Sequence, residues 1–111
     1  MNVRRGDIFW ADVTEGTGLH KERLVLIIQN DRGNKFSNQT IIAPIRHDAQ
    51  KELPIHVSLN RGMAGLKKDS VIDCALITAI YKDQLRDYQG HLPDLHMHQV
   101  NKALKISLAL T

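Results

Sequence analysis

Cationic and titratable side chains gather at two places in the sequence, each next to an apolar run. The first place is residues 14–23, and the second directly follows the apolar residues 40–45. Cleavage of RNA without a metal needs a base for the 2′-hydroxyl, an acid for the departing 5′-oxygen and a cation beside the phosphorane charge. Histidine and arginine can provide all three. An ordinary solvated surface has the same composition, so the residue types alone leave both interpretations open. The side chains concerned are His20, Lys21, Arg23, Arg46 and His47.

The other histidines do not have a metal-binding spacing. Metal ligands on a helix usually stand three or four residues apart, whereas His96 and His98 are two apart and would point to different sides of a helix. His91 precedes Pro93 and therefore has a different local conformation. His56 falls within a predicted strand, where a hydrogen-bonded and partly buried ring is the simpler interpretation. We expect no metal and no other cofactor.

No motif supports nucleotide hydrolysis or a nucleophilic serine or cysteine. Gly16 and Gly18 lack the later Gly, Lys and Ser or Thr of a phosphate-binding loop, and no Gly-x-Ser-x-Gly sequence occurs. Cys74 lies within an extended apolar stretch and is interpreted as a core thiol. A single cysteine fits a reducing compartment, and no apolar run approaches the ~20 residues of a membrane span. These features predict a cytoplasmic protein that does not enter a membrane.

Length and charge constrain the domain organisation and the partner. A chain of 111 residues can bury one core, so we expect a single domain over residues 1–111. The formal net charge is +3. Residues 1–68 contain eleven Lys and Arg against seven Asp and Glu, whereas residues 69–111 contain four against five. A polyanionic partner should therefore meet the N-terminal two-thirds of the chain.

Five extended segments are expected to position the candidate side chains. Residues 7–13 mix aromatic and β-branched residues, and residues 24–28 are continuously apolar, which is typical of a strand buried on both faces. Further strands are predicted at residues 40–45, 55–59 and 70–80.

Three details refine this prediction. Pro44 has no N–H and indicates a sheet edge or a bulge. Residues 29–34 are rich in Asn, Asp and Gly, which favours a turn. Asp73 is expected to point away from the core face of residues 70–80. That core face is expected to carry Ile72, Cys74, Leu76 and Ile80.

The C-terminal segment changes to a helical period. The helix is expected to start at Asp94, an N-cap after Pro93, and Leu95 and Ile106 widen its apolar stripe. Residues 82–86 are expected to form a short helical turn. The chain is therefore predicted to be mainly β, a small barrel or curled sheet closed by one C-terminal helix. The apolar positions of the helix are Met97, Val100, Ala103, Leu104 and Leu108.

Several separated blocks of the sequence resemble the MazF/PemK (Kid) toxin family. They follow one another in the family's order and together span nearly the whole chain, so the resemblance does not depend on one short pattern. The blocks are RGDIFWADV at residues 5–13, RLVLIIQND at 23–31, GNKFS at 33–37, LPIHV at 53–57, LKKDSVI at 66–72 and VNKALKISL at 100–108.

The resemblance implies a small SH3-like barrel of mostly antiparallel strands with a C-terminal α-helix, assembled as a homodimer. It implies a sequence-specific, metal-independent endoribonuclease that cleaves single-stranded RNA to 2′,3′-cyclic phosphate and 5′-hydroxyl ends. It also implies a MazE-like antitoxin whose disordered acidic tail would fit the positive N-terminal two-thirds. Operator DNA is a further partner that the family binds through the antitoxin complex.

Carried over residue by residue, the resemblance assigns catalysis to Arg23. The family's loop before the second strand reads Gly-Gly-x-Arg-Pro, and this chain keeps only the arginine. Arg46 stands where the family has Thr or Ser, and Ala75 stands where it has an acidic residue. Residues 78–79, Thr-Ala, replace an Arg-Thr pair, and Asp73 lies two residues from the acidic position.

Two versions of the function follow from these departures. In the first, His20 or His47 serves as base or acid while Arg23 and Arg46 hold the phosphate as permanent cations. In the second, the scaffold has lost cleavage and only binds RNA, the antitoxin or operator DNA. A purely structural SH3-like module is a third class, but it does not account for the blocks shared with the toxins. The RNA-binding candidates are Lys21, Lys35, Asn34 and Thr17.

Overall fold

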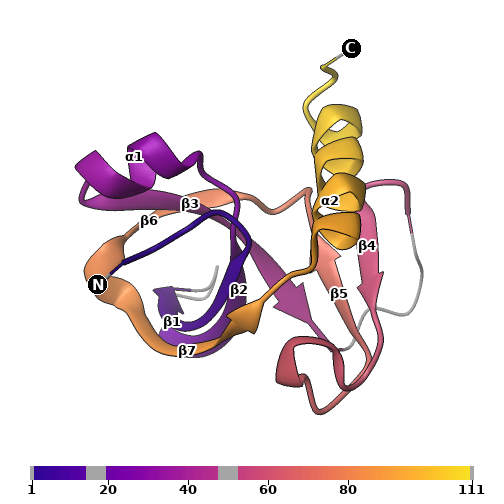
Figure 1. The fold of residues 1–111 in the computed structure, drawn as a ribbon, viewed down its shortest axis with the longest axis horizontal. Helices are drawn as coiled ribbons and strands as arrows, with labels where there is room; N and C mark the ends of the chain where they lie inside the picture. Colours follow the sequence, from indigo (N-terminus) through magenta and orange to yellow (C-terminus); the bar gives the residue numbers. More distant parts are fainter. Residues whose placement is uncertain (1, 15–19, 48–52, 111) are drawn as a thin grey trace.

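The computed structural model describes residues 2–14, 20–47 and 53–110 (Figure 1). The helices within these ranges are α1 (Asp31–Phe36), α2 (Asp94–Ser107) and the 3₁₀ turns η1 (Met63–Gly65) and η2 (Lys82–Gln84). The strands are β1 (Asp7–Thr14), β2 (His20–Ile27), β3 (Gln39–Arg46), β4 (His56–Leu59), β5 (Ser70–Asp73), β6 (Thr78–Tyr81) and β7 (Leu85–His91).

The strands form one antiparallel sheet that curls on itself. Their order is β4-β5-β3-β2-β1-β7, and β6 pairs with a separate part of β3. α2 packs against β4, whereas α1 lies at the start of β3, on the other side of the molecule (Figure 1). This mainly β, barrel-like architecture with a C-terminal helix confirms the expected fold class.

Both faces of the central strands are buried. Leu24 and Leu26 of β2 point into one apolar cluster together with Ile45 and Ile72. Val25 and Ile27 point into a second cluster that contains Phe9, Ile42 and Leu85. Because successive strand residues face opposite sides, a strand between two clusters must be apolar throughout. The continuous apolar run of residues 24–28 was correctly interpreted in this way.

β3 changes its outer partner along its length. Residues 39–42 pair with β6, and Ile45 and Arg46 pair with β5. Pro44 lies between the part of β3 that pairs with β6 and the part that pairs with β5. On the other edge of β3 it pairs with Val25 of β2. A residue without an N–H fits there because no outer strand needs its hydrogen bond. The proline therefore marks a gap in pairing inside the sheet and not an edge strand.

A helix replaces the turn that was expected at residues 29–34. Asn30 caps α1 by accepting a hydrogen bond from the Gly33 N–H at 2.8 Å. Asn34 is buried, and its Oδ1 accepts from Thr40 Oγ1 at 2.7 Å, which fastens the helix to β3. The turn prediction was wrong because the asparagines that favour turns also cap and anchor short helices.

The single strand expected over residues 70–80 is also wrong, because the chain turns after Asp73. The Asp73 carboxylate accepts the Ala75 N–H at 3.0 Å, a local bond that diverts the backbone from the sheet. Leu76 is consequently 53% exposed and does not join the core face, whereas Ile72, Cys74 and Ile80 are buried. Two short strands, β5 and β6, result from this break.

α2 confirms the predicted C-terminal helix. Asp94 is its first residue, and the N-cap position belongs to Pro93 and not to Asp94. Met97, Val100 and Ala103 are buried and Leu104 packs against them, as the spacing predicted. Leu95 and Ile106 are exposed, so they do not widen the buried stripe, and Leu108, which the spacing placed on the apolar face, is exposed at the C-cap. Neither α-helix of the described ranges has the length and apolarity that crossing a membrane requires.

Candidate active site

The two candidate arginines belong to neighbouring positions on adjacent strands. Arg23 pairs with Ala11 of β1, and the next residue, Leu24, pairs with Ile45 of β3. Arg23 and Arg46 are the residues that follow this last pair, one on each strand. By strand alternation both belong to the face of Val25. The fold therefore brings the two predicted cations together at one end of the sheet.

A buried carboxylate compensates this pair of positive charges. Arg46 pairs with Val71 of β5, and Asp73, two residues further on, lies on the same face. Arg46 Nη2 is 3.0 Å from Asp73 Oδ2. The Asp73 side chain is 5% exposed and that of Arg46 32% exposed, so the ion pair has a buried end and an open end. The open end can meet a ligand.

His56 forms the other neighbour of Asp73 and is built into the sheet. Its Nδ1 accepts the Leu53 N–H at 3.2 Å, which assigns the proton of a neutral ring to Nε2. Nε2 lies 3.6 Å from Asp73 Oδ1, and the His56 side chain is 8% exposed. This arrangement confirms the prediction of a hydrogen-bonded, partly buried histidine.

His47 lies on the opposite face from Arg46. Its Nδ1 is 3.0 Å from Ser70 Oγ, and this hydroxyl donates its own hydrogen to the Lys68 carbonyl at 2.9 Å. Ser70 can therefore only accept from His47, so Nδ1 carries the proton and Nε2 carries the lone pair of the neutral ring. The structure thus separates His47 from the arginines but leaves it in a tautomer that can accept a proton.

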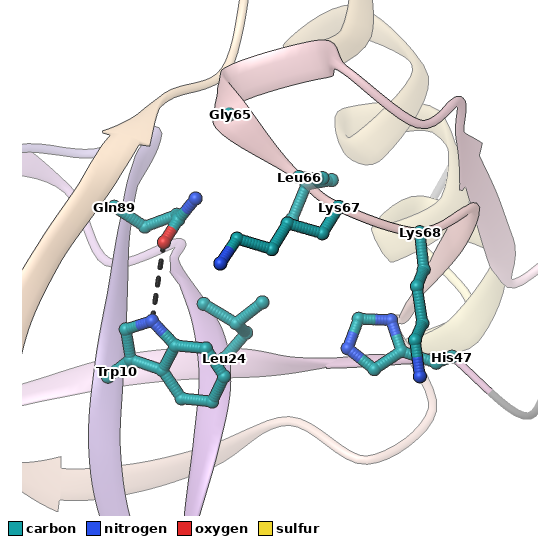
Figure 2. Close-up of a pocket in the computed structure, with 8 residues that line it drawn as sticks. All are labelled: Trp10, Leu24, His47, Gly65, Leu66, Lys67, Lys68 and Gln89. Atoms are coloured by element: carbon teal, nitrogen blue, oxygen red, sulfur yellow. Dashed lines mark hydrogen bonds between the residues drawn. The ribbon is translucent and has the colours of Figure 1, made fainter.

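A groove of about 250 Å³ lies beside His47. Figure 2 shows Trp10 and Gln89 on one side and His47 and Lys68 on the other, with Lys67 reaching between them. Trp10 Nε1 donates to Gln89 Oε1 at 3.2 Å, which fixes the indole as part of the wall. Sequence reasoning missed Trp10, Lys67 and Lys68. The sequence signal that could have indicated this groove was an aromatic residue within a strand together with two adjacent lysines in a loop.

The predicted RNA-binding residues are dispersed. Lys21 lies opposite Val13 in the β1–β2 pair, on the same strand as Arg23. Lys35 is in α1 at the start of β3, whereas Arg46 is at its end, so the structure does not bring Lys35 to the arginines. Asn34 is 2% exposed and bonded to Thr40, which leaves it a structural anchor and not part of an RNA surface. Thr17 and the side chain of His20 lie outside what the structure describes.

Cys74 and His91 both have structural surroundings. Burial, followed by the charge of Asp73, raises the pKa of the Cys74 thiol to about 11, so this core thiol stays protonated at neutral pH. His91 Nδ1 is 2.8 Å from Oδ1 of the buried Asp7, which ties this ring to β1. In the described ranges, no three His, Cys, Asp or Glu side chains are grouped so that they could hold a metal ion.

Comparisons with known proteins identify the family. Residues 4–108 match the family described as PemK-like, MazF-like toxin of type II toxin-antitoxin system. The chain is 44% identical to endoribonuclease EndoA of Bacillus subtilis (strain 168), over 99% of this chain and 97% of that protein. It is 40% identical to endoribonuclease MazF of Staphylococcus saprophyticus, over 97% and 92% of the two chains.

Solved structures share the fold. A mycobacterial endoribonuclease in complex with its cognate antitoxin superposes with a TM-score of 0.84 at 21% identity, over 98% of this chain and 97% of that one. A MazE–MazF complex from Deinococcus radiodurans gives 0.82 at 18% identity, over 100% of both chains. With the family match and the close relatives, the chain therefore belongs to the PemK-like, MazF-like toxins of type II toxin–antitoxin systems.

Proposed function

We propose that this chain is a sequence-specific endoribonuclease toxin that cleaves single-stranded RNA without a metal and leaves 2′,3′-cyclic phosphate and 5′-hydroxyl ends. The family match and two relatives named endoribonucleases, each aligned over more than nine-tenths of both chains, support this assignment. Residues 1–111 act as one domain, and the reaction takes place in the cytoplasm. The protein works as a homodimer.

The observation that carries the mechanism is the ion pair of Arg46 with the buried Asp73, at the end of the sheet where Arg23 follows the last residue pair of β2 and β3. The scissile diester enters between the two guanidinium groups. Attack of the 2′-hydroxyl raises the negative charge on the phosphorus oxygens, so two fixed cations stabilise the phosphorane more than the ground state. Asp73 holds Arg46 from behind, which fixes the guanidinium before the RNA arrives. Arg46 thus holds the phosphate with a permanent positive charge at the position where the family has a neutral hydroxyl.

A histidine performs the proton transfers, and His20 and His47 are the two candidates. His47 has its Nε2 lone pair available but faces the groove with Trp10 and Lys67. Because His47 and Arg46 lie on opposite faces, His47 serves as base only if the bound RNA bends around the end of β3. His20 begins β2, three residues before Arg23. His20→Ala and His47→Ala, compared in a pH–rate profile, identify the base, because its loss removes the acidic limb of the profile.

Lys21 and the two lysines of the groove guide the RNA backbone, since cations of this kind contact phosphates without reading sequence. An acidic antitoxin tail competes for the same positive surface. The mycobacterial and Deinococcus complexes with antitoxins provide the structural precedent for such a partner. Operator DNA is bound through the antitoxin complex and not by the toxin alone.

The purified protein tests this function directly. Incubated with total RNA in the presence of a chelator, it should create new 5′ ends that primer extension maps to one short motif. Polynucleotide kinase should label these ends without prior phosphatase treatment, because they carry a free hydroxyl. Induction in cells should arrest growth. Binding of RNA with neither new ends nor arrest would instead favour a protein that has lost cleavage.

A further inference from the structure

Phe36, at the C-terminal end of α1, is an aromatic side chain that the fold leaves in solvent. It is 73% exposed, and Tyr81 of β6, which is 51% exposed, lines the same groove of about 390 Å³. Ser37, Asn38, Lys82 and Asp83 complete the lining. A single hydrophobic residue on a protein surface is normal, whereas two exposed aromatic rings on one groove indicate an interaction site.

Two cations surround the Phe36 ring. Lys35 Nζ lies 5.4 Å and Arg32 Cζ 5.9 Å from its centroid. Within the described part of the chain, no carboxylate forms an ion pair with either. The nearby Asp31 accepts the Arg5 N–H at 2.6 Å. Both cations are therefore available to an incoming anion while they stand beside an aromatic face.

The groove is held rigidly although its rings are exposed. Asn34 fastens α1 to β3 through Thr40, and the Lys82 ammonium donates to the Asn34 carbonyl oxygen. The backbone N–H of Tyr81 donates to Gln84 Oε1 at 2.8 Å, which anchors the backbone at this residue. The backbone that carries both rings is therefore anchored, which lowers the conformational entropy lost when a ligand binds.

We propose that this groove is a second RNA-contact site, in which an unpaired base stacks on Phe36 and the adjoining phosphates meet Arg32 and Lys35. Aromatic faces flanked by cations are the usual platform for single-stranded nucleic acid, and stacking tolerates any base. The amide of Asn38 and the hydroxyl of Ser37 supply hydrogen-bonding groups at the same place. The identity of the ligand as RNA rests on the proposed function.

The second site lies far from the arginines. Phe36 precedes β3 and Arg46 ends it, so the strand, which is about 23 Å long from Gln39 to Arg46 when extended, lies between them. A short RNA that fills the cleavage site cannot reach Phe36, whereas a longer one can occupy both. The groove therefore acts on affinity for RNA flanking the cleaved motif and not on the chemical step.

Fluorescence anisotropy with two unstructured RNAs tests the inference, one of about 20 nucleotides and one of about 6 that is its central part. Full 2′-O-methylation removes the nucleophile, so binding is measured without cleavage. Phe36→Ala should weaken binding of the long RNA about 10-fold and leave the short RNA unchanged. Phe36→Leu should show the same loss, and Phe36→Trp should restore binding. Leu95→Ala, which truncates another exposed apolar side chain, is the matched control and should bind like the wild type.

The outcomes separate the second site from the proposed function. Equal binding of the long RNA by wild type and Phe36→Ala overturns the second site, even if the wild type cleaves RNA. Wild-type affinity of Phe36→Leu overturns stacking as the cause. If the wild type cleaves nothing but Phe36→Ala still loses affinity for the long RNA, the second site stands and the proposed function fails. Loss of binding to a purified acidic antitoxin, with RNA binding intact, would assign the groove to a protein partner and also overturn the inference.

Discussion

Arg46 shows how a single substituted position changes what its neighbours must do. A second guanidinium at the same end of the sheet as Arg23 adds a like charge on the same face, which is unfavourable in a sheet. Asp73 removes this cost through its 3.0 Å contact with Arg46 Nη2, and the same carboxylate also accepts the Ala75 N–H. The net charge of the three groups is positive, so the site keeps its attraction for phosphate.

Arg23 should be required for cleavage. We expect Arg23→Ala to lower the single-turnover rate at least about 100-fold, because it removes a fixed cation beside the phosphorane. The thermal unfolding midpoint should stay close to that of the wild type. Arg86→Ala is a suitable control, since Arg86 is 3.6 Å from Asp12 on the surface and outside the proposed site. Cleavage by Arg23→Ala at the wild-type rate would remove Arg23 from the mechanism.

Arg46→Thr restores the hydroxyl that the family resemblance places there, but it also leaves a buried carboxylate without its cation. We expect stability in urea to fall by about 1–3 kcal/mol and cleavage to fall at least about 10-fold through the lost phosphate contact. Adding Asp73→Asn should recover part of the stability, because Asn can still accept the Ala75 N–H, but it should not recover cleavage. An increase in cleavage by Arg46→Thr alone would contradict the proposal that the Arg46 guanidinium stabilises the phosphorane.

Cys74 should respond to pH as a buried thiol. Burial, with the charge of Asp73, raises its pKa from 9.0 to about 11 in the folded chain. Between these values the unfolded state loses the proton first, so stability should decline as pH rises from about 9 to 11, by roughly 2 kcal/mol. Cys74→Ala should show a smaller decline over this window in urea titrations. Rapid labelling of native Cys74 by a thiol reagent at pH 8 would be inconsistent with this burial.

At the scale of elements, α1 is the part most dependent on one buried polar side chain. Asn34 accepts from Thr40 Oγ1 and donates from Nδ2 to the Gln29 carbonyl at 3.0 Å. We expect Asn34→Ala to lower the free energy of unfolding by about 1–3 kcal/mol, because these buried partners lose their bonds. Cleavage of a short RNA, assayed well below the unfolding midpoint, should be unchanged. A loss of cleavage without a loss of stability would place Asn34 in the RNA site instead.

The elements that could be predicted are those whose apolar period is set by burial. β1, β2, β3, β4 and α2 contact the core through regular positions, and the sequence alone located each of them within a few residues. Among the strands of the described ranges β7 pairs only with β1, and it buries little beyond Leu85, so it carries no periodic signal. The break after Asp73 depends on one side-chain bond, and α1 depends on tertiary anchoring by Asn34. Neither the break nor α1 produces a hydrophobic periodicity that the sequence would show.

The candidate site was predictable only in part for the same reason. Strand alternation, once the register is known, places Arg23 with Arg46 and sends His47 to the other face. The register between β2 and β3 joins residues far apart in sequence, and no local pattern specifies it. Asp73 reaches Arg46 through β5 in the same way.

At the scale of the whole molecule, charge is distributed according to the proposed partner. The excess of Lys and Arg over Asp and Glu lies in residues 1–68, which contain both arginines, the groove lysines and the cations of α1. Residues 69–111 carry a slight negative excess and form α2 and β7, among others. RNA is therefore expected to contact residues 1–68 preferentially, and salt should weaken that contact strongly.

Two substitutions that remove the same charge should consequently differ in effect. Lys67→Gln, in the groove beside Trp10, should reduce the slope of log affinity for single-stranded RNA against log salt by about 0.7, the value for one phosphate contact. Lys102→Gln, on α2, should leave the slope unchanged, although both variants have the same net charge. Anisotropy titrations of an uncleavable RNA at several salt concentrations measure the two slopes. Equal reductions would mean that the RNA responds to net charge alone, and the groove would then have no particular part in holding the RNA backbone.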